Sequence, residues 1–572
     1  MILQALTRYY EDLAKRGDIA RPGWAKAKIS CALCVNERGE LEQVVPLLDE
    51  TTGKKPQPMQ LDLPAPVKRT VGIAANFLWD NSGYLLGADA KGKPERSVRC
   101  FEACKQLHHR LLDGVDSAAA RGILAFFDNW TPDQAREHPA LQADYEAVTA
   151  GGNLLLRVNG AFAQEDEAIC RAWQTYYDHA EGETRQCLVT GEEDVIEATH
   201  PSIKGVDGAQ SSGAALVSFN APAFCSFGQE QNYNAPVGKR AAFAYTAALN
   251  HLLANRENVQ KIGDASVVCW AEGAEPQYQT FTFAALFGNQ EVTLSEGDVR
   301  DAVRKLAKGQ SVEKWNLKPN QPFYILDLSP NAARLSVRFF YRGTFGELMR
   351  NVNAHHERME IVRPSYDRFE TIPLRALLRE TVNPNARDKS PSPAMSGATA
   401  RAIFTGGLYP ASLLEQTMLR IRAEREVTRS RAAIIKAYYL RNPNDDCPKE
   451  VLTVALNEAS TNPAYTLGRL FSVYEAVQEA ANPNLNATIK DKYFNSAASS
   501  PATIFPFLGK LCQKHLRKLD KGQRIWYEKR IMELSCFFGE NFPAQLSLPQ
   551  QGSFILGYYH QTQKRYEKKE EQ

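Results

Sequence analysis

The sequence lacks any run of 18 uninterrupted apolar residues, and its first residues lack the long apolar core of a secretory signal peptide. We therefore expect neither export nor a membrane partner. Cysteine is sparse and scattered, with 11 in 572 residues, which excludes a disulfide-dense secreted domain and predicts reduced thiols in the cytoplasm. A net charge of only +2 excludes a uniformly basic protein, so a nucleic acid would have to bind at local basic patches.

Recognisable catalytic motifs are also missing. Residues 208–213 have the glycine frame of a phosphate-binding loop, but Ala214 and Ala215 stand where a nucleotide triphosphatase needs Lys followed by Ser or Thr. No G-x-S-x-G elbow occurs, and the single C-x-x-C at Cys31 and Cys34 has no second pair at zinc spacing. We therefore predict no catalytic residue, no bound metal and no cofactor.

Two pairs of adjacent histidines keep a metal-dependent nuclease open as the alternative function. Adjacent side chains on a helix point about 100° apart, so such a pair rarely holds one metal ion. Dispersed carboxylates would have to complete the site. The histidines concerned are His108, His109, His355 and His356.

The composition, with 44% hydrophobic and 23% charged residues, is typical of a folded chain, and 572 residues exceed the roughly 150 of an ordinary domain. The first two thirds mix helical and strand periodicity without a repeating βαβ pattern. Helices are predicted at 1–18, 98–112 and 240–253. Strands are predicted at 28–35, 154–158, 186–189, 215–219, 267–270, 323–327 and 335–341.

A Ser- and Pro-rich stretch at 390–396 predicts a linker. Beyond it strand patterns nearly disappear, and Asn-Pro pairs separate helical segments because the residue before Pro avoids the α conformation. These helices are predicted at 411–441, 447–459, 463–481, 501–519 and 523–538. The predicted fold class is α+β, with an irregular mixed α/β region over residues 1–395 followed by a C-terminal helical bundle over 396–572.

The bundle contains two runs of basic residues at helical spacing, which predicts one basic face for each run. Two such stripes fit a groove that follows phosphates. A solvated helix face, neutralised in the first run by Glu424 and Glu426, is the alternative interpretation. The first run consists of Arg420, Arg422, Arg425, Arg429 and Lys436, and the second of Lys510, Lys514, Arg517, Lys521 and Arg524.

Residues 199–240 join a loop rich in Gly, Ser and Gln to a segment rich in Asn and Gln. Glycine permits a close approach of the backbone to a ligand. Lys, Gln, Ser and Asn are side chains that contact base edges or phosphates. An ordinary polar loop is the alternative.

Several long motifs resemble those of one family. Residues 1–11, 72–81 and above all 200–220 are similar to motifs of the large subunit of the type I-C CRISPR surveillance complex, Cascade, and residues 226–231 and 234–237 follow in the same order. Phe227 stands where Tyr is expected more often. The resemblance extends from the first residue into the C-terminal bundle.

The resemblance implies a subunit without a catalytic centre, at the end of the complex that holds the 5′ end of the guide crRNA. Its implied partners are the Cascade backbone subunits, the guide-end capping subunit, the small subunit and double-stranded target DNA. It would recognise the short protospacer-adjacent motif, help to separate the strands, steady the displaced strand with its bundle, and present the site to a recruited helicase-nuclease. In such complexes guide pairing reads sequence, while protein reads only a short duplex motif.

Recognition of that motif is expected from the minor groove, whose edges small polar side chains can reach. The wedge that starts strand separation would be a Gln or an aromatic residue, with the 208–213 loop as its source. A purely architectural subunit that only joins its neighbours remains the third interpretation. The residues predicted to recognise the motif are Asn76, Asn81, Lys204, Gln210, Ser211 and Ser212, followed by Asn220, Gln229, Gln231 and Asn234.

Overall fold

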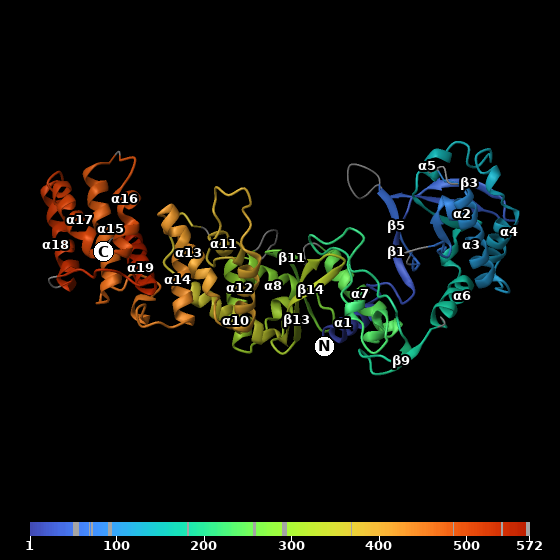
Figure 1. Cartoon of the computed structure of the whole chain (residues 1–572), viewed down its shortest axis with the longest axis horizontal. Helices are drawn as coiled ribbons and strands as arrows, with labels where there is room; N and C mark the ends of the chain where they lie inside the picture. Colours follow the sequence, from blue (N-terminus) through green and yellow to red (C-terminus); the bar gives the residue numbers. More distant parts are fainter. Residues whose placement is uncertain are drawn as a thin grey trace. The chain divides into compact units, whose positions relative to one another are not determined.

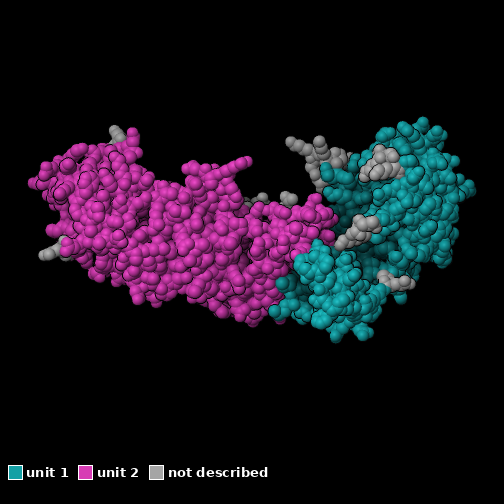
Figure 2. All heavy atoms as spheres, in the orientation of Figure 1, with its two compact units in different colours: residues 1–201, 217–248 teal, residues 202–216, 249–572 magenta. Residues whose placement is uncertain are grey.

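The computed structural model describes residues 1–49, 57–67, 69, 72–89, 94–179, 182–255, 259–288, 295–367, 369–483, 485–538 and 541–567. The chain forms two compact units (Figure 2). The first comprises residues 1–201 and 217–248, and the second comprises residues 202–216 and 249–572. The signature at 200–220 is therefore divided between them.

The first unit is built around a mixed sheet in which strand β2 is buried along its whole length. β2 runs parallel to β7 and antiparallel to β3, while β6 and β8 pair with β7. Buried Leu154, Leu155 and Leu156 of β7 explain the apolar run that predicted this strand. The strands are β2 (Cys31–Val35), β3 (Leu41–Pro46), β6 (Trp79–Asn81), β7 (Asn153–Val158) and β8 (Ala161–Phe162).

A second sheet in this unit is formed by β1 (Trp24–Ile29), β5 (Gln57–Pro64) and β4 (Leu48–Asp49). The strand predicted at 28–35 is thus two strands in different sheets. The strand predicted at 186–189 is wrong. The observed strand β9 (Thr184–Gln186) ends at Gln186, and Cys187 begins a turn in which the Gly191 amide donates to the Cys187 carbonyl. β9 pairs with β10 (Glu193–Val195).

The helices of the first unit include the predicted segments 1–18 and 98–112, which are confirmed as α1 and α3. The predicted helix at 240–253 is confirmed as α7, which continues from the first unit into the second. The bounds are α1 (Ile2–Arg16), α2 (Ser82–Leu85), α3 (Pro94–Leu112), α4 (Ala118–Asn129), α5 (Tyr145–Thr149), α6 (Glu167–Asp178) and α7 (Lys239–Ala254).

The second unit begins with an antiparallel sheet whose four described strands follow in sequence order, and the strands predicted at 267–270, 323–327 and 335–341 are confirmed in it. The strand predicted at 215–219 is wrong, since Ala215 makes only an isolated bridge with Arg334 at the sheet edge. The strands are β11 (Val259–Ile262), β12 (Ala265–Ala271), β13 (Pro322–Asn331) and β14 (Arg334–Thr344). Five helices follow or interrupt them: α8 (Gln277–Phe287), α9 (Glu296–Ala307), α10 (Phe345–Met359), α11 (Leu374–Arg379) and α12 (Pro393–Thr405).

The C-terminal part is helical, as predicted, and Figure 1 shows α15–α19 gathered around the C-terminus in red. The single helix predicted at 411–441 is wrong: α13 ends at Glu424, the following Arg425 has a left-handed backbone (φ 56°), and Thr428 caps a new helix, α14. The helix predicted at 447–459 is also wrong, because that segment contains only the 3-10 turn Lys449–Val451. The helices are α13 (Ala411–Glu424), α14 (Arg429–Arg441), α15 (Pro463–Ala481), α16 (Ile489–Ser499), α17 (Pro501–Leu516), α18 (Lys521–Ser535) and α19 (Leu548–Tyr566).

Helices α15 and α19 pack unusually closely. A Cβ added to Gly468 would lie 1.9 Å from the carbonyl oxygen of Phe554, and one added to Gly557 would lie 2.0 Å from that of Tyr465. Only glycine fits at these crossings. The domain boundary predicted at residue 395 lies inside α12 and inside the second unit, where Met395 is buried.

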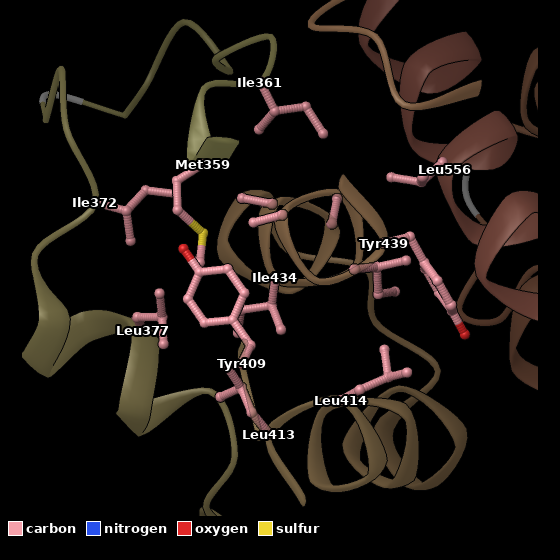
Figure 3. Close-up of a cluster of buried hydrophobic side chains, with 14 of the residues drawn as sticks. Met359, Ile361, Ile372, Leu377, Tyr409, Leu413, Leu414, Ile434, Tyr439 and Leu556 are labelled. Carbon is pink, nitrogen blue, oxygen red and sulfur yellow. The ribbon is translucent and has the colours of Figure 1, made fainter. Parts of the chain in front are cut away.

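Helix α14 is buried on nearly every side. Figure 3 shows Ile434 of this helix among Leu377 of α11, Leu413 of α13 and Met359 of α10, while Leu556 of α19 lies beyond Tyr439. A helix surrounded in this way belongs to the core. Its polar side chains must therefore find partners inside the protein.

Candidate nucleic-acid interface

The loop at 203–214 in the second unit is closed at its base like a short hairpin. The backbone groups of Ile203 and Ala214 exchange hydrogen bonds of 2.8 and 2.9 Å. Next to them, the Ala215 amide donates to the Ala333 carbonyl and the Leu335 amide donates to the Ala215 carbonyl, both at 2.9 Å. The base of the loop is thus attached to the edge of the sheet at the start of β14.

Further contacts brace this loop from within the same unit. The Asn250 side chain of α7 accepts a hydrogen bond from the Lys204 amide at 2.8 Å and donates to the Ser202 carbonyl at 3.1 Å. The Asp207 amide donates to Ser266 Oγ at 3.0 Å. Gly213 has a φ of 95°, and a Cβ there would lie 2.8 Å from the Ile203 carbonyl oxygen, so the tight base requires glycine.

The loop presents polar side chains to solvent. Lys204, Gln210, Ser211 and Ser212 are all exposed, and the Gly213 amide donates to the Gln210 carbonyl at 2.9 Å, which closes the tip. Such a set offers one cation and several hydrogen-bond donors and acceptors on a fixed backbone. It can contact phosphates and groove edges without a large rearrangement.

The predicted residues of the 220–234 segment divide into exposed and internally bonded side chains. Asn220 and Gln231 are exposed. Asn234 instead holds its own loop, since Oδ1 accepts from the Ser226 amide at 2.8 Å and Nδ2 donates to the Gln229 and Gln231 carbonyls at 3.1 and 2.9 Å.

Gln229 is likewise used inside the first unit. Its side-chain oxygen accepts a hydrogen bond from the Arg185 guanidinium at 2.8 Å. Arg185 also forms an ion pair with Glu183 at 2.6 Å. Gln229 therefore supports the loop, and whether it also contacts DNA stays a prediction.

Asn76 and Asn81 are also bonded within the protein. Asn76 is 5% exposed and its Oδ1 accepts from the Val67 amide at 2.9 Å, whereas Asn81 Oδ1 caps α2 by accepting from the Gly83 amide at 3.0 Å. Both residues flank the buried Asp80, which is ion-paired with Arg69. In this conformation the motif at 72–81 holds a turn, and the Asn76 side chain is not presented to a ligand.

The first basic run does not form the single exposed stripe that its spacing predicted. Arg429 is buried: it forms an ion pair with Asp367 at 2.9 Å and donates to the carbonyls of Phe369 and Glu370 at 2.6 and 2.8 Å. Arg420 is mostly buried and pairs with Glu424 at 3.3 Å. These side chains cannot reach a phosphate in this conformation.

Lys436 of the same run is buried against the end of α10, where Nζ donates to the Arg358 carbonyl at 3.0 Å. Burial lowers the pKa of Lys436 to about 8, although the Glu360 carboxylate acts in the opposite direction. Its charge thus lies where a helix C-terminus favours a cation. Of this run, Arg422 and Arg425 remain exposed, and Arg422 donates to the Gln551 side chain at 2.7 Å.

The second basic run is divided between two helices, α17 and α18, so only its first part forms the single face that its spacing predicted. Lys510, Lys514 and Arg517 are exposed along one face of α17 and in the turn that follows it. Within the described residues, none of the three has an acidic side chain at ion-pair distance. Lys521 and Arg524 begin α18, and Arg524 pairs with Glu528 at 3.3 Å.

Sequence reasoning missed two aromatic groups beside these surfaces. Phe507 precedes the α17 cations on the same face, is 47% exposed and meets Tyr493 of α16 edge to face, with ring centroids 5.4 Å apart. Phe227 is almost completely exposed in the first unit. The spacing of Phe507 to Lys510 could have revealed the first group, whereas nothing in the sequence indicates how exposed Phe227 is.

The histidines of the nuclease alternative are tied into the fold. His108 is buried: its Nδ1 contacts the Cys104 carbonyl at 2.8 Å, and its Nε2 accepts a hydrogen bond from the Leu78 amide at 3.0 Å. Burial lowers the pKa of His108 to about 4. His355 contacts the Tyr409 hydroxyl at 2.7 Å, and burial lowers the pKa of His356 to about 4.

The other partner of the first pair, His109, bonds to Asp113 and Asp128. Across the described part of the chain, no group of three or more His, Cys, Asp or Glu side chains could hold a metal ion. Nor does any helix described there have the length and apolar character needed to cross a membrane.

Comparison with known families gives the context of these surfaces. A family model described as CRISPR-associated protein (Cas_Csd1) matches residues 6–566. The chain belongs to this family. The resemblance stated from the motifs is confirmed, and the protein is a component of a CRISPR Cascade complex, which implies assembly with other Cas subunits and crRNA. A search of curated proteins finds no match for this chain.

Proposed function

We propose that this Csd1-family protein is the large subunit that recognises the protospacer-adjacent motif in double-stranded DNA, assists strand separation and R-loop formation, and recruits a helicase-nuclease. It contributes no catalytic residue, and DNA cleavage belongs to the recruited enzyme. Its other partners are the backbone subunits, the guide-end capping subunit and the small subunit. Guide pairing supplies sequence specificity, so the protein has to read only a short duplex motif.

The observation that carries this proposal is the braced loop at 203–214. Its backbone is fixed by the Ile203–Ala214 pair and by Asn250, while Lys204 and Gln210 remain exposed. A preformed polar loop loses little conformational freedom when it binds, which favours contacts with groove edges and phosphates. Ser211 and Ser212 add small donors and acceptors suited to the narrow minor groove.

The α17 surface supports the second part of the proposal. Lys510, Lys514 and Arg517 supply charge for phosphates, and Phe507 with Tyr493 supplies an exposed aromatic edge beside them. Basic grooves with aromatic platforms bind single strands with little sequence preference. We assign this surface, rather than the buried first run, to the displaced strand.

Binding by the assembled complex tests the proposal. Target duplexes with and without the motif are titrated with wild-type complex and with complex carrying Lys204→Ala and Gln210→Ala. We expect the double variant to lose most of the preference for the motif. Lys308→Ala with Gln310→Ala is a matched control, because both residues are exposed in the same unit outside the loop. Unchanged preference in the loop variant, or equal loss in the control, contradicts the assignment.

A further inference from the structure

Phe227 lies in a tight turn with an unusual backbone. The Gln229 amide donates to the Ser226 carbonyl at 2.9 Å, and both residues between them are left-handed, with φ of 52° at Phe227 and 69° at Gly228. Turns of this kind favour Asn followed by Gly, because a bulky side chain crowds the left-handed backbone. Phe227 is therefore held in a conformation that its side chain disfavours.

The ring of Phe227 gains no packing in return. It is 99% exposed, whereas Phe224 in the preceding 3-10 turn is 40% exposed. The strained backbone opposes folding, and a ring that stays hydrated contributes no burial energy to offset the strain. Since no contact among the described residues of this unit offsets the strain, the arrangement indicates a ligand for the ring.

The turn that carries the ring is rigidly supported. Asn234 makes three hydrogen bonds across its base, and the Arg185 guanidinium holds the Gln229 side chain at 2.8 Å. Asn234 of the same loop and Arg185 of β9 therefore fix the positions of Ser226 and Gln229, the two ends of the turn. A side chain on such a supported turn keeps its position when it contacts a ligand.

The surroundings of the ring favour DNA over a protein partner. A protein-binding anchor is normally the centre of a desolvated apolar patch. Here the residues next to the ring, Ser226, Gly228, Gln229, Glu230 and Gln231, are polar or glycine, and the exposed apolar residues Pro222, Ala223 and Phe224 lie in the preceding 3-10 turn. A single apolar ring on a polar tip is instead the form of the wedges that enter a base step and kink a duplex.

We propose that Phe227 inserts its ring into the base stack of the target duplex beside the recognised motif and holds the first separated step open. The inference rests on the proposed function and assigns mechanical support, not base reading, to Gln229 and Asn234. It also places the wedge at 226–229 rather than in the 208–213 loop.

Fluorescence of 2-aminopurine next to the motif, in the fully assembled complex, measures opening of the duplex. We expect Phe227→Ala to slow opening of paired DNA about 5- to 150-fold, the range of one aromatic–base stack. Phe227→Trp should retain most of the rate, and Phe224→Ala serves as the matched aromatic control. On DNA whose first pairs beside the motif are mismatched, Phe227→Ala should match the wild type.

Phe227→Asn separates the wedge from a role in folding. Asn tolerates the left-handed backbone, so this variant should be at least as stable as wild type and yet open paired DNA slowly. The inference is overturned if Phe227→Ala or Phe227→Asn opens paired DNA at the wild-type rate. It is also overturned if Phe227→Ala slows opening of mismatched DNA as much as it slows opening of paired DNA. If the wild-type complex shows no preference for the motif, the proposed function itself fails, which distinguishes the two outcomes.

Discussion

The two basic runs of the bundle make the sharpest prediction, because they look alike in sequence and differ in structure. Neutralising Lys510, Lys514 and Arg517 together removes three exposed cations from α17 and its end. If each cation contacts one phosphate of a single strand, each contact releases counterions and contributes about −0.7 to the slope of log K plotted against log salt concentration. The triple variant should therefore have a slope shallower by about 2.

The magnitude can be stated for a convenient salt range. Between 50 and 200 mM salt, a slope difference of about 2 means that the wild type loses about 20-fold more affinity than the variant. Fluorescence anisotropy of the complex with a single-stranded DNA of displaced-strand sequence gives both slopes. The thermal unfolding midpoint of the variant should stay close to that of the wild type, because exposed cations without ionic partners contribute little to stability.

The control removes the same charge elsewhere. Lys305, Lys308 and Lys389 are exposed in the second unit outside the bundle, and their replacement by Ala should leave the slope unchanged. A slope that does not change on neutralising the α17 run, or that changes equally in the control, would refute the assignment of this surface to the displaced strand.

Three further predictions concern stability. Arg429→Ala should destabilise the second unit by about 3 kcal/mol without changing the salt slope, because it leaves a partly buried carboxylate and two carbonyls without their partner; calorimetry and anisotropy check both parts. Gly468→Ala should lower the thermal midpoint by several degrees, since its Cβ would lie 1.9 Å from a backbone oxygen of α19, whereas Gly397→Ala on α12 has open space and should not. Burial lowers the pKa of His108, His356 and His560 from 6.5 to about 4, so on acidification the unfolded chain binds protons at these residues before the folded chain does. The free energy of unfolding should therefore fall as pH drops from about 6.5 to about 4, by up to about 4 kcal/mol per pH unit if all three contribute. A free energy of unfolding in urea that stays constant over that pH range would contradict this prediction.

Some features of this protein follow directly from its sequence. The α+β class is confirmed, because short continuous apolar runs such as the one in β7 and apolar residues at spacings of three and four such as those in α1 depend on local geometry. The long motifs were sufficient to indicate the family. The exposed face of α17 was also predictable. The apolar residues of this helix recur at helical spacing on its packed side, and its cations recur at helical spacing on the other side.

Only the tertiary structure decided which basic and polar side chains are available to a ligand. Arg429 and Lys436 have the same spacing as a surface stripe, but α14 is enclosed by neighbouring helices whose carbonyls and carboxylates bind these cations. Asn76 and Asn234 have the chemistry of base readers but satisfy backbone groups of their own turns. The exposure of Phe227 depends on a left-handed turn and on contacts that join residues far apart in the chain, so no local pattern could specify it.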